Sequence, residues 1–309
     1  MTLEDLRLDI DKIDMKITSL LNQRIEKALL TKKLKKNIED TGREKLVLDK
    51  IRNSSNCLLD PGFAEGLYKT IIGETKRIQA TDQRTIGFQG EHGAYSEVAA
   101  RALYPSGAMI PCREFTDVFD MIEEGLIDCG IVPVENTLGG LVGPVNSILI
   151  YTHLKIIAAI DMPVRHCLLC IPGADHRELR QVWSHTQALS QCRNFIARNR
   201  LEPQQHYDTA GSARDLAELR PKGVAAIASK LCADLYGLEI IKEDIQDSSH
   251  NRTRFFVLSM DGGDQEGDRC SAVFTAGDKA GSLFAVLSVF AKASINLTRI
   301  ESVPDKPGT

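Results

Sequence analysis

Three polar side chains of different chemistry follow one another directly after an apolar run: Glu135, Asn136 and Thr137. The run before them, residues 130–134, is typical of a buried strand, and two glycines at 139–140 then interrupt the backbone. Ligands of open α/β sheets bind at the carboxyl ends of strands, so a carboxyl, an amide and a hydroxyl there can form a compact polar site. The alternative is an ordinary turn whose polar residues cap the next helix.

A second candidate site consists of cations on a helix. Arg24, Ala28, Thr31 and Lys35 have spacings of 4, 3 and 4 and so share one face of the predicted helix. The two cations would stand about 16 Å apart across short side chains, a gap that fits a small dianion. Arg7 is about 25 Å from Arg24 along the axis, so in an antiparallel dimer it would enter the partner's site. The alternative is a solvated basic face with ordinary ion pairs. The carboxylates within reach are Glu26 and Asp40.

Three further turns lead into predicted helices and present glycines, hydroxyls or amides. Singly, each is better explained as a helix cap, but three positive helix ends in one unit favour an anion pocket. The turns are Gly87 to Gly93 with Ser96 as the expected N-cap, Ser184 to Gln187 leading to Gln191, and Asp208 to Ser212 with Thr209 inside it.

Charge and composition limit the classes of function. The net charge is −4 with a pI near 6.0, which argues against a nucleic-acid-binding surface over the whole chain. Residues 1–80 carry 16 basic and 13 acidic residues, so an anionic ligand would favour this part. No apolar run reaches the roughly 18 residues of a membrane span, and the N-terminus has no signal-peptide pattern. We therefore expect no membrane or nucleic-acid partner.

The eight cysteines show no disulfide framework. Cys167 and Cys170 have the spacing of a metal or redox pair, but they lie in an apolar run without a second pair, so we interpret them as ordinary strand residues. No Cys/His cluster has metal-ligand spacing, and we expect neither a metal nor an organic cofactor. The cysteine usage predicts a cytoplasmic protein with reduced thiols.

The elements that must position these residues change character along the chain. Apolar positions from Leu3 to Leu20 repeat every three or four residues, which predicts a helix to about Asn37 that Gly42 ends. Two more helices are expected, near 43–52 and 63–79. A helix of about 50 Å is too long to pack alone, so a homodimer or higher homo-oligomer is expected.

Residues 81–260 alternate between strand-like and helix-like runs. One set extends from Thr85 to Asp161 and a second from Cys167 to Ser259, which predicts two α/β lobes with a cleft between them. A Gly-rich acidic linker at 261–269 follows. A strand at 271–276, a helix at 282–293 and a strand at 296–302 are expected after it.

Residues 3–80 resemble the all-helical chorismate mutase domain, on Leu6-Arg7, Ile10 to Asp14, Leu20-Leu21 to Arg24, Lys35, Arg43-Glu44 and Ile71-Ile72 through Gln79. The resemblance implies that the partner subunit's Arg7 acts with Arg24 and Arg43 on the carboxylates of chorismate. It also assigns Lys35 and Gln79 to the ether oxygen and Glu44 to the ring hydroxyl, with Thr75 at a position where the family often has Ser. Such a rearrangement needs a held conformer and fixed charges, not a nucleophile.

Residues 84–260 resemble prephenate dehydratase. The motifs that carry the resemblance are 90–100, 132–142, 184–192, Ala225 to Ser229, Tyr236 to Leu238 and Asn251 to Phe256. Thr186 and Glu91 stand at positions where the family has Pro. The resemblance places Thr253 closest to the leaving hydroxyl of prephenate, with Glu135 supporting the polar network; the proton donor stays open because a Thr hydroxyl is a very weak acid. The residues it assigns to substrate orientation are Arg254, Asn136, Ser184 and Gln191, and the polar turns described above add Thr137, Ser96 and Thr209 as candidate substrate-binding residues.

Residues 270–309 resemble about half of an ACT domain, a regulatory module that binds L-phenylalanine in this family. The resemblance rests on Gly281 to Phe284, where Leu283 follows the usual Gly-small pattern, and on Glu301-Ser302-Val303-Pro304, where the family has Arg in place of Val303. It implies L-phenylalanine as an effector, which the missing Arg weakens. We expect either a truncated chain or an impaired regulatory module.

Together these observations predict a multidomain protein. We expect an all-α chorismate mutase domain (1–80), a two-lobed, periplasmic-binding-protein-like α/β prephenate dehydratase domain (84–260) and a partial α+β ACT domain (270–309). The predicted function is the conversion of chorismate to prephenate and of prephenate to phenylpyruvate. One rival is a solute-binding module with a helical dimerisation hairpin, and another is a dehydratase with a degenerate mutase part.

Overall fold

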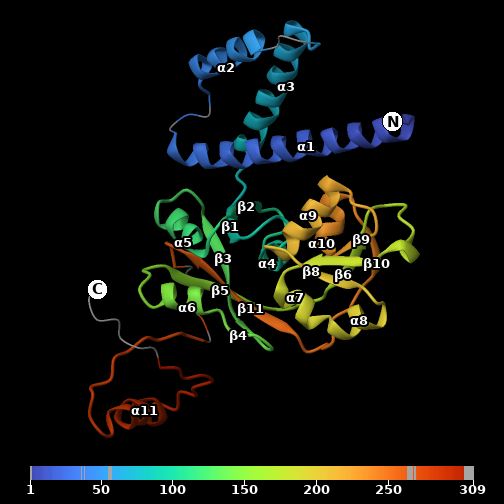
Figure 1. Ribbon diagram of the computed structural model, residues 1–309. Coiled ribbons are helices and arrows are strands. Elements are labelled where there is room, and N and C mark those ends of the chain that lie inside the picture. Colours follow the sequence, from blue (N-terminus) through green and yellow to red (C-terminus); the bar gives the residue numbers. More distant parts are fainter. Residues whose placement is uncertain are drawn as a thin grey trace. The chain divides into compact units, whose positions relative to one another are not determined.

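The computed structural model describes residues 2–35, 37, 39–54, 58–262, 267 and 269–302. It divides into two units, Met1–Gly263 and Asp264–Thr309. The first unit contains a helical part and two α/β lobes (Figure 1).

Three helices form the N-terminal part: α1 (Leu3–Leu34), α2 (Thr41–Ser54) and α3 (Pro61–Ala80). Thr2 and Asp60 cap the N-termini of α1 and α3, in each case through a side-chain oxygen that accepts a main-chain N–H. The three predicted helices are confirmed, but two boundaries differ. The first helix ends at Leu34, and Gly42 lies inside α2 instead of ending α1. Asp40 accepts the Arg43 N–H at 2.9 Å, which allows α2 to begin earlier than expected.

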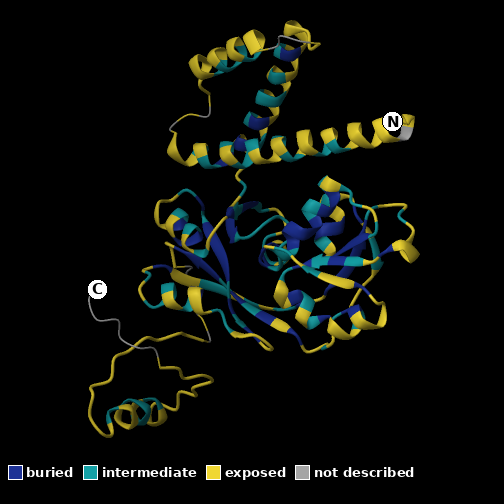
Figure 2. Ribbon diagram, viewed as in Figure 1, coloured by how far each residue is buried: buried dark blue, intermediate teal, exposed yellow. Residues whose placement is uncertain are grey.

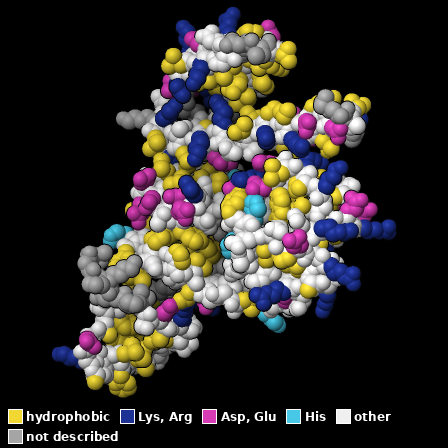
Figure 3. Space-filling view, viewed as in Figure 1, with side chains coloured by type: hydrophobic (Ala, Val, Ile, Leu, Met, Phe, Trp, Pro, Cys, Tyr) yellow, Lys and Arg dark blue, Asp and Glu magenta, His cyan; other side chains and the backbone are white. Residues whose placement is uncertain are grey.

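The apolar stripe of α1 is exposed over its N-terminal half. Ile10, Ile17 and Leu20 are 57%, 50% and 62% exposed, whereas Leu29 is 6% exposed. Figure 2 shows most of the helical part as exposed, and Figure 3 shows hydrophobic side chains gathered on its visible face. Among the described residues, the exposed stripe positions of the N-terminal half of α1 therefore lack the apolar cover that Leu29 has in the C-terminal half.

The first lobe is a six-stranded sheet of order β2-β1-β3-β11-β5, with β4 paired to β3. The β1–β2 and β1–β3 pairs are parallel, and β11 is antiparallel to both β3 and β5. Its strands are β1 (Thr85–Gln89), β2 (Ala108–Cys112), β3 (Cys129–Asn136), β4 (Gly140–Leu141), β5 (Lys155–Pro163) and β11 (Arg252–Ser259). Its helices are α4 (Tyr95–Leu103), α5 (Phe115–Glu123) and α6 (Gly143–Leu149).

The second lobe is a five-stranded sheet of order β10-β6-β9-β7-β8. Its strands are β6 (Cys167–Cys170), β7 (Gln181–Ser184), β8 (Glu202–Gln205), β9 (Val224–Ala228) and β10 (Glu239–Lys242). Its helices are the 3₁₀ helix His176–Glu178, α7 (Thr186–Gln191), α8 (Arg193–Arg198), α9 (Thr209–Leu219) and α10 (Lys230–Tyr236).

The two-lobed α/β arrangement is confirmed, with one difference in topology. The last strand of the chain's second set, β11, does not belong to the second lobe but returns to the first lobe, between β3 and β5. Its apolar alternation requires two buried faces, because Phe255 and Val257 pack on the α4 side and Phe256 and Leu258 on the α5–α6 side. The sequence pattern alone could not specify which sheet would supply those faces.

Cys167 and Cys170 are strand residues of β6, as predicted. Both are buried, and because they are three residues apart on a strand their side chains point to opposite faces of the sheet. Both thiols have a pKa near 11, raised chiefly by burial.

The second unit contains α11 (Ser282–Lys292), which confirms the predicted helix. Residues 271–276 and 296–302 were expected to be strands and are not, since the described part of this unit contains no strand pairing. A strand is stable only when its main chain is paired, and these two segments do not pair with each other. Val303 and Pro304 lie outside the described residues.

Within the described ranges, no helix combines the length and the hydropathy that a membrane span requires.

Candidate active sites

Arg24 and Thr75 form the centre of the helical site. Arg24 lies on α1 and donates from Nη1 to the hydroxyl of Thr75 on α3 at 2.6 Å, and Thr75 itself donates to the Ile71 carbonyl at 2.7 Å. Thr75 is buried and Arg24 is half-buried. The guanidinium is therefore held between the two helices and directed inward, as a cation must be to meet a bound anion.

Gln79 completes this cluster one helical turn further along α3. It is 7% exposed, and its amide nitrogen donates to the Ala28 carbonyl and lies 3.5 Å from the Thr31 hydroxyl. The Ala28 carbonyl and the Thr31 side chain thus both contact Gln79, in agreement with the predicted face that these two residues share. A guanidinium and a neutral amide on one inner face can grip a carboxylate and an ether oxygen together.

Lys35 does not continue the face of Arg24. The helix ends at Leu34, so Lys35 has an extended backbone at the C-cap, and its exposed amine pairs with Asp40 at 3.4 Å. Arg43 is also exposed and is tied to the same Asp40 through its main-chain N–H. The structure therefore ties Lys35 and Arg43 to Asp40 at the α1–α2 connection. Neither residue contacts the Arg24–Thr75 pair in the described hydrogen bonds.

Glu44 and Arg7 occupy two further places in the helical part. Glu44, on α2, forms an ion pair with Lys76 of α3 at 2.6 Å. Arg7 is exposed in the N-terminal half of α1, about 25 Å along the helix from Arg24. Within one chain, Arg7 cannot join the Arg24 cluster.

Asn136 and Thr253 form the centre of the second site, at the ends of two paired strands. They are register partners, and the Asn136 amide donates to the Thr253 hydroxyl at 2.9 Å. An uninterrupted alternation along β3 would direct Asn136 to the side of Val132 and Val134. The register shifts between Arg254 and Phe255, and this irregularity turns Asn136 to the face of Thr253.

The Asn136 side chain is fully used. Its nitrogen also donates to Asn251 Oδ1 at 2.8 Å, and its oxygen accepts the N–H groups of Leu138 and Gly139 at 3.0 and 2.7 Å. Thr253 therefore serves as an acceptor toward Asn136. Among the described residues no acceptor is assigned to its own O–H, which can donate to a ligand.

A chain of polar contacts extends this pair across both lobes. The Asn251 amide donates to Gln191 Oε1 at 3.0 Å, and the same oxygen lies 2.9 Å from His166 Nε2. His166 Nδ1 in turn lies 2.9 Å from the hydroxyl of Tyr95, at the start of α4. Residues of α4, β3, β11, α7 and the segment before β6 thus meet in one network, where the chain crosses between the lobes.

His166 is neutral in this network. Burial lowers its pKa, and the hydrogen bond with Gln191 offsets only part of that effect. With Nε2 protonated toward Gln191, Nδ1 is left as an acceptor, and the single O–H proton of Tyr95 is then shared between Nδ1 and the Arg165 carbonyl, which lies 2.7 Å from the hydroxyl. The network is therefore a neutral, hydrogen-bonding wall.

Glu135 and Arg254 lie on the other side of the sheet. They are register partners next to Asn136 and Thr253, and neighbouring strand residues point to opposite faces. Arg254 forms a bidentate ion pair with Asp161 of β5, at 2.9 and 3.0 Å. The expected roles of Glu135 in the polar network and of Arg254 in orienting substrate are thus not matched by their positions, because the alternation of the strands separates them from Thr253.

The four remaining predicted residues take no part in the network around Asn136 and Thr253 that is described above. Ser184 is fully buried and donates to the Ile227 carbonyl at 2.7 Å, and the Thr137 hydroxyl donates to the His250 carbonyl at 2.9 Å. Ser96 is buried as the second residue of α4, whose N-cap is Ala94 and not Ser96. Thr209 begins α9, which Asp208 caps.

Sequence reasoning missed Tyr95, His166 and Asn251. Asn251 is the first residue of the segment 251–256, which carries part of the resemblance to prephenate dehydratase, so membership of that segment could have identified it. Tyr95 and His166 stand beside loops or apolar strands with no characteristic spacing, so only the fold brings them to the site.

Away from this network, one group of metal-ligand side chains occurs in the described part of the chain. It consists of Cys170, His176 and Glu239, whose ligand atoms lie within 4.8 Å of one another. His176 and Glu239 are exposed and form an ion pair at 3.6 Å, which explains their proximity. The group shares no residue with either candidate site.

The fold and the two sites define a class: a helical part with an inward-facing cation, joined to a two-lobed α/β ligand-binding fold with a neutral polar wall. Comparison with known proteins specifies the family. The model of the prephenate dehydratase family matches residues 86–262, and that of chorismate mutase type II matches residues 6–80. The chain belongs to the prephenate dehydratase family and carries an N-terminal region of the chorismate mutase type II family.

Relatives support the same assignment. Arogenate dehydratase/prephenate dehydratase 2 of Arabidopsis thaliana is 39% identical over 233 residues, which are 74% of this chain and 61% of the relative. A bifunctional N-acyl-homoserine lactone acylase/prephenate dehydratase of Komagataeibacter europaeus is 34% identical, over 71% of this chain and 80% of the relative. Arogenate dehydratase 2 of Petunia hybrida is covered over 56% of its length, so the chain spans about six-tenths of these two plant relatives.

A solved prephenate dehydratase from Arthrobacter aurescens, in complex with L-Phe, has a similar fold. Its TM-score is 0.63 at 29% identity, and the match covers 71% of this chain and 76% of that one.

Proposed function

We propose that this chain rearranges chorismate to prephenate in its helical part and converts prephenate to phenylpyruvate in its two-lobed part. The observation that carries the proposal is the presence in one chain of both sites, the Arg24–Thr75–Gln79 cluster and the Asn136–Thr253 pair. The two matched family models cover the same two regions.

In the mutase step the protein holds a compact conformer and stabilises charge. Arg24 binds a carboxylate, and Gln79 donates to the ether oxygen as its bond lengthens and negative charge builds on it. A donor that meets more charge in the transition state than in the ground state accelerates the reaction. Lys35 and Arg43 would join this site if the α1–α2 connection closed over the substrate.

The helical site is proposed to be completed in a homodimer. The exposed apolar stripe of α1, from Leu3 to Leu20, needs an apolar partner, and a second copy supplies one of the same shape. An antiparallel pairing would bring the partner subunit's Arg7 to the Arg24 cluster.

In the dehydratase step the ring carboxylate leaves as carbon dioxide, and its bonding electrons move into the ring and expel the hydroxyl, which takes up a proton and leaves as water. In this proposal the Thr253 O–H donates a hydrogen bond to the departing oxygen, which is supported by the fact that none of the described residues accepts from it. Arg254 is paired with Asp161 on the other face, so this wall offers no cation that would hold the carboxylate charge in place. A neutral wall therefore favours decarboxylation.

Regulation and location are further parts of the proposal. We propose that residues 270–309 belong to an ACT module responsive to L-phenylalanine, with Gly281, Leu283, Glu301 and Ser302 at the effector site. The solved relative in complex with L-Phe supports this choice of effector.

The seven cysteines described as free thiols, six of them buried, are consistent with a reducing, cytoplasmic location.

The substrate assignment is tested by offering the purified protein prephenate and arogenate separately and measuring phenylpyruvate and phenylalanine. The proposal predicts that prephenate is turned over with the higher kcat/KM, because the mutase part makes prephenate. A preference for arogenate would overturn the substrate, and binding of both without turnover would support a solute-binding module instead.

A further inference from the structure

The loop between β1 and α4, residues 90–94, is the place where three parts of the first unit meet. Gly90 and Gly93 have φ values of +111° and +92°, which favour glycine and fold the loop tightly. From the second lobe, the Ser229 hydroxyl donates to the Gly93 carbonyl at 2.6 Å and the Tyr236 hydroxyl donates to the His92 carbonyl at 2.7 Å. The loop therefore joins the first lobe to the second.

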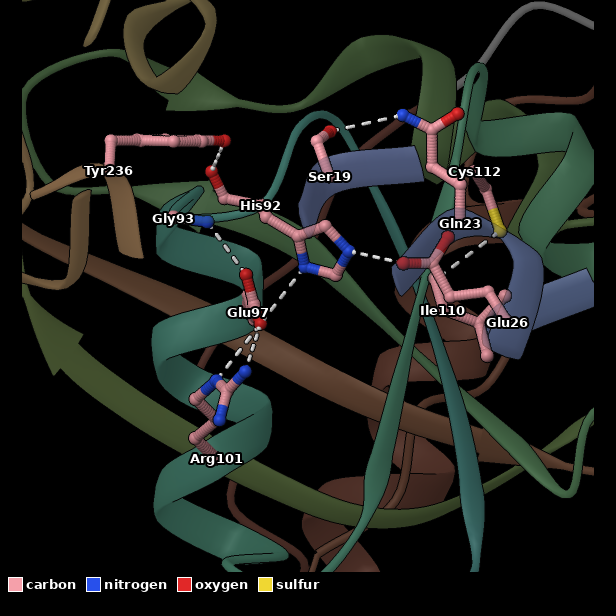
Figure 4. Close-up of polar contacts among 10 residues, drawn as sticks. All are labelled: Ser19, Gln23, Glu26, His92, Gly93, Glu97, Arg101, Ile110, Cys112 and Tyr236. Atoms are coloured by element: carbon pink, nitrogen blue, oxygen red, sulfur yellow. Dashed lines mark hydrogen bonds and ion pairs between the residues drawn. The ribbon is translucent and has the colours of Figure 1, made fainter. Parts of the chain in front are cut away.

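The helical part reaches the same loop through one side chain. His92 Nε2 lies 3.0 Å from the carboxylate of Glu26 on α1, and His92 Nδ1 lies 3.2 Å from Glu97 on α4 (Figure 4). Glu97 is fully buried and also accepts the Gly93 N–H at 2.6 Å and two hydrogen bonds from Arg101 at 2.9 and 2.7 Å. A buried carboxylate with this many donors is fixed in one position.

These contacts place the first turn of α4, and that turn carries a residue of the dehydratase network. Tyr95 is the first residue of α4 and Glu97 the third. Tyr95 meets His166, and the network continues from there to Gln191, Asn251 and the Asn136–Thr253 pair. Two sets of polar contacts, joined through the backbone of the first turn of α4, thus connect α1 with the wall of the dehydratase site.

His92 can hold both carboxylates only while it is charged, because a neutral imidazole has a single N–H. Although burial lowers its pKa, the hydrogen bonds with Glu26 and Glu97 raise it to about 9. The charged groups around it are Glu26 from α1 together with Glu97 and Arg101 from α4, and Tyr236 contacts it from α10. The double contact is therefore made throughout the neutral range and is lost as the pH rises through about 9.

Glu26 is separated from the mutase cluster by the geometry of its helix. It follows Arg24 by two residues, and a step of two on a helix turns the side chain by about 200°. Arg24 faces Thr75 of α3, while Glu26 faces the dehydratase loop.

We propose that Glu26 of the mutase helix is a positioning residue for the dehydratase reaction, holding the loop 90–94 and the start of α4 through His92. The proposal rests on the dehydratase function proposed above and adds to it a residue from outside the dehydratase lobes. In this view, the helical part is a structural component of the dehydratase site.

The test compares Glu26→Ala with a matched control in the full-length protein. Lys33→Met removes another contact between α1 and the first lobe, the ion pair of Lys33 with Asp128, without touching loop 90–94. We expect Glu26→Ala to lower the dehydratase kcat/KM at least about tenfold, the size expected for a lost hydrogen bond to a charged group. We expect Lys33→Met to stay within about twofold of wild type, and both variants to rearrange chorismate normally.

Glu26→Gln supplies a readout that a merely structural role would not change. An amide accepts from charged His92 and donates to neutral His92, so this variant should keep the dehydratase activity at pH 7.5 and lose the wild-type decline near pH 9. This pH comparison also decides the question if Glu26→Ala does not fold.

Three results would overturn the inference: a Glu26→Ala dehydratase equal to wild type, an equal loss in Lys33→Met, or a Glu26→Gln profile that declines near pH 9 as wild type does. A wild-type protein that did not convert prephenate would instead overturn the proposed function, and this inference with it.

Discussion

Replacing Thr253 with Val tests the assignment of the dehydratase hydroxyl. Val has nearly the shape of Thr and suits a strand, so the substitution removes the O–H with little change in packing. Thr253 is 8% exposed and makes one assigned side-chain hydrogen bond, the one it accepts from Asn136 at 2.9 Å. The Asn136 nitrogen keeps two other acceptors, Asn251 Oδ1 and the Arg252 carbonyl.

The structure therefore predicts a small effect on stability and a large one on rate. Losing one hydrogen bond whose donor keeps other partners costs about 1 kcal/mol in the free energy of unfolding. Losing a donor aimed at charge that develops in the transition state costs about 10²–10³ in kcat. The ratio of the two effects distinguishes a group that acts on the substrate from one that only supports the fold.

The assay measures phenylpyruvate formed from prephenate, with urea unfolding of the same preparation as the stability control. Thr253→Ser is the matched variant, because it keeps the hydroxyl, and it should retain kcat within about tenfold although Ser is less restricted at χ1. A folded Thr253→Val protein with kcat within about threefold of wild type would refute the role of this hydroxyl.

Three further predictions concern other parts of the chain. Arg24→Ala should abolish chorismate rearrangement and spare prephenate turnover, since Arg24 meets Thr75 in the helical part; normal chorismate turnover in this variant would remove the mutase assignment. Mixing Arg7→Ala with Arg24→Ala protein should restore part of the mutase rate, because a mixed dimer contains one site with an intact Arg24 and the partner subunit's Arg7, and no recovery after subunit exchange would speak against a shared site. His166 has a pKa lowered by burial, so the unfolded chain binds a proton that the native state resists, and the free energy of unfolding should fall as the pH drops below about 6.5, by up to about 1.4 kcal/mol per pH unit. Urea titrations between pH 5 and 7.5 measure this slope, which should be smaller in His166→Gln.

Much of the fold could be predicted because local patterns and packing agree. The stripe of α1 and the buried runs of β1, β3, β6 and β9 have the periodicity of the elements they form. The strands β8 and β10 were not predicted, because polar residues occupy most of β8 and both ends of β10, and β2 was not predicted, because Pro111 interrupts its short apolar run. The helix expected after the turn at Ser184 to Gln187 is divided at Cys192, where the backbone leaves helical geometry between α7 and α8.

Parts of the candidate sites could be predicted where the type and spacing of residues determine which side chains meet. They could not be predicted where a register shift or a helix end determines the direction of a side chain. The spacing of Arg24 and Thr31 predicted one shared helix face, and in the structure Arg24 contacts Thr75 and Thr31 contacts Gln79, both on α3. The separation of Glu135 from Asn136 follows from strand alternation and a register shift, neither of which the motif shows. Lys35 left the expected face because α1 ends one residue before it.

The contribution of α1 to the dehydratase part was also not predictable from sequence. Glu26 stands in a helix with ordinary charge patterning, and His92 stands in a glycine loop that resembles many others. Their contact arises because α1 packs on the first lobe through Leu29 and contacts the core of the second lobe through Met15. Such long-range contacts leave no trace in local periodicity.

The most direct test of the account is to supply the purified protein with chorismate alone and to follow the formation of phenylpyruvate. The account predicts that phenylpyruvate appears after a lag in which prephenate accumulates, and that Arg24→Ala eliminates the product while added prephenate restores it. Consumption of chorismate without phenylpyruvate, or an Arg24→Ala protein that still forms phenylpyruvate from chorismate, would contradict it.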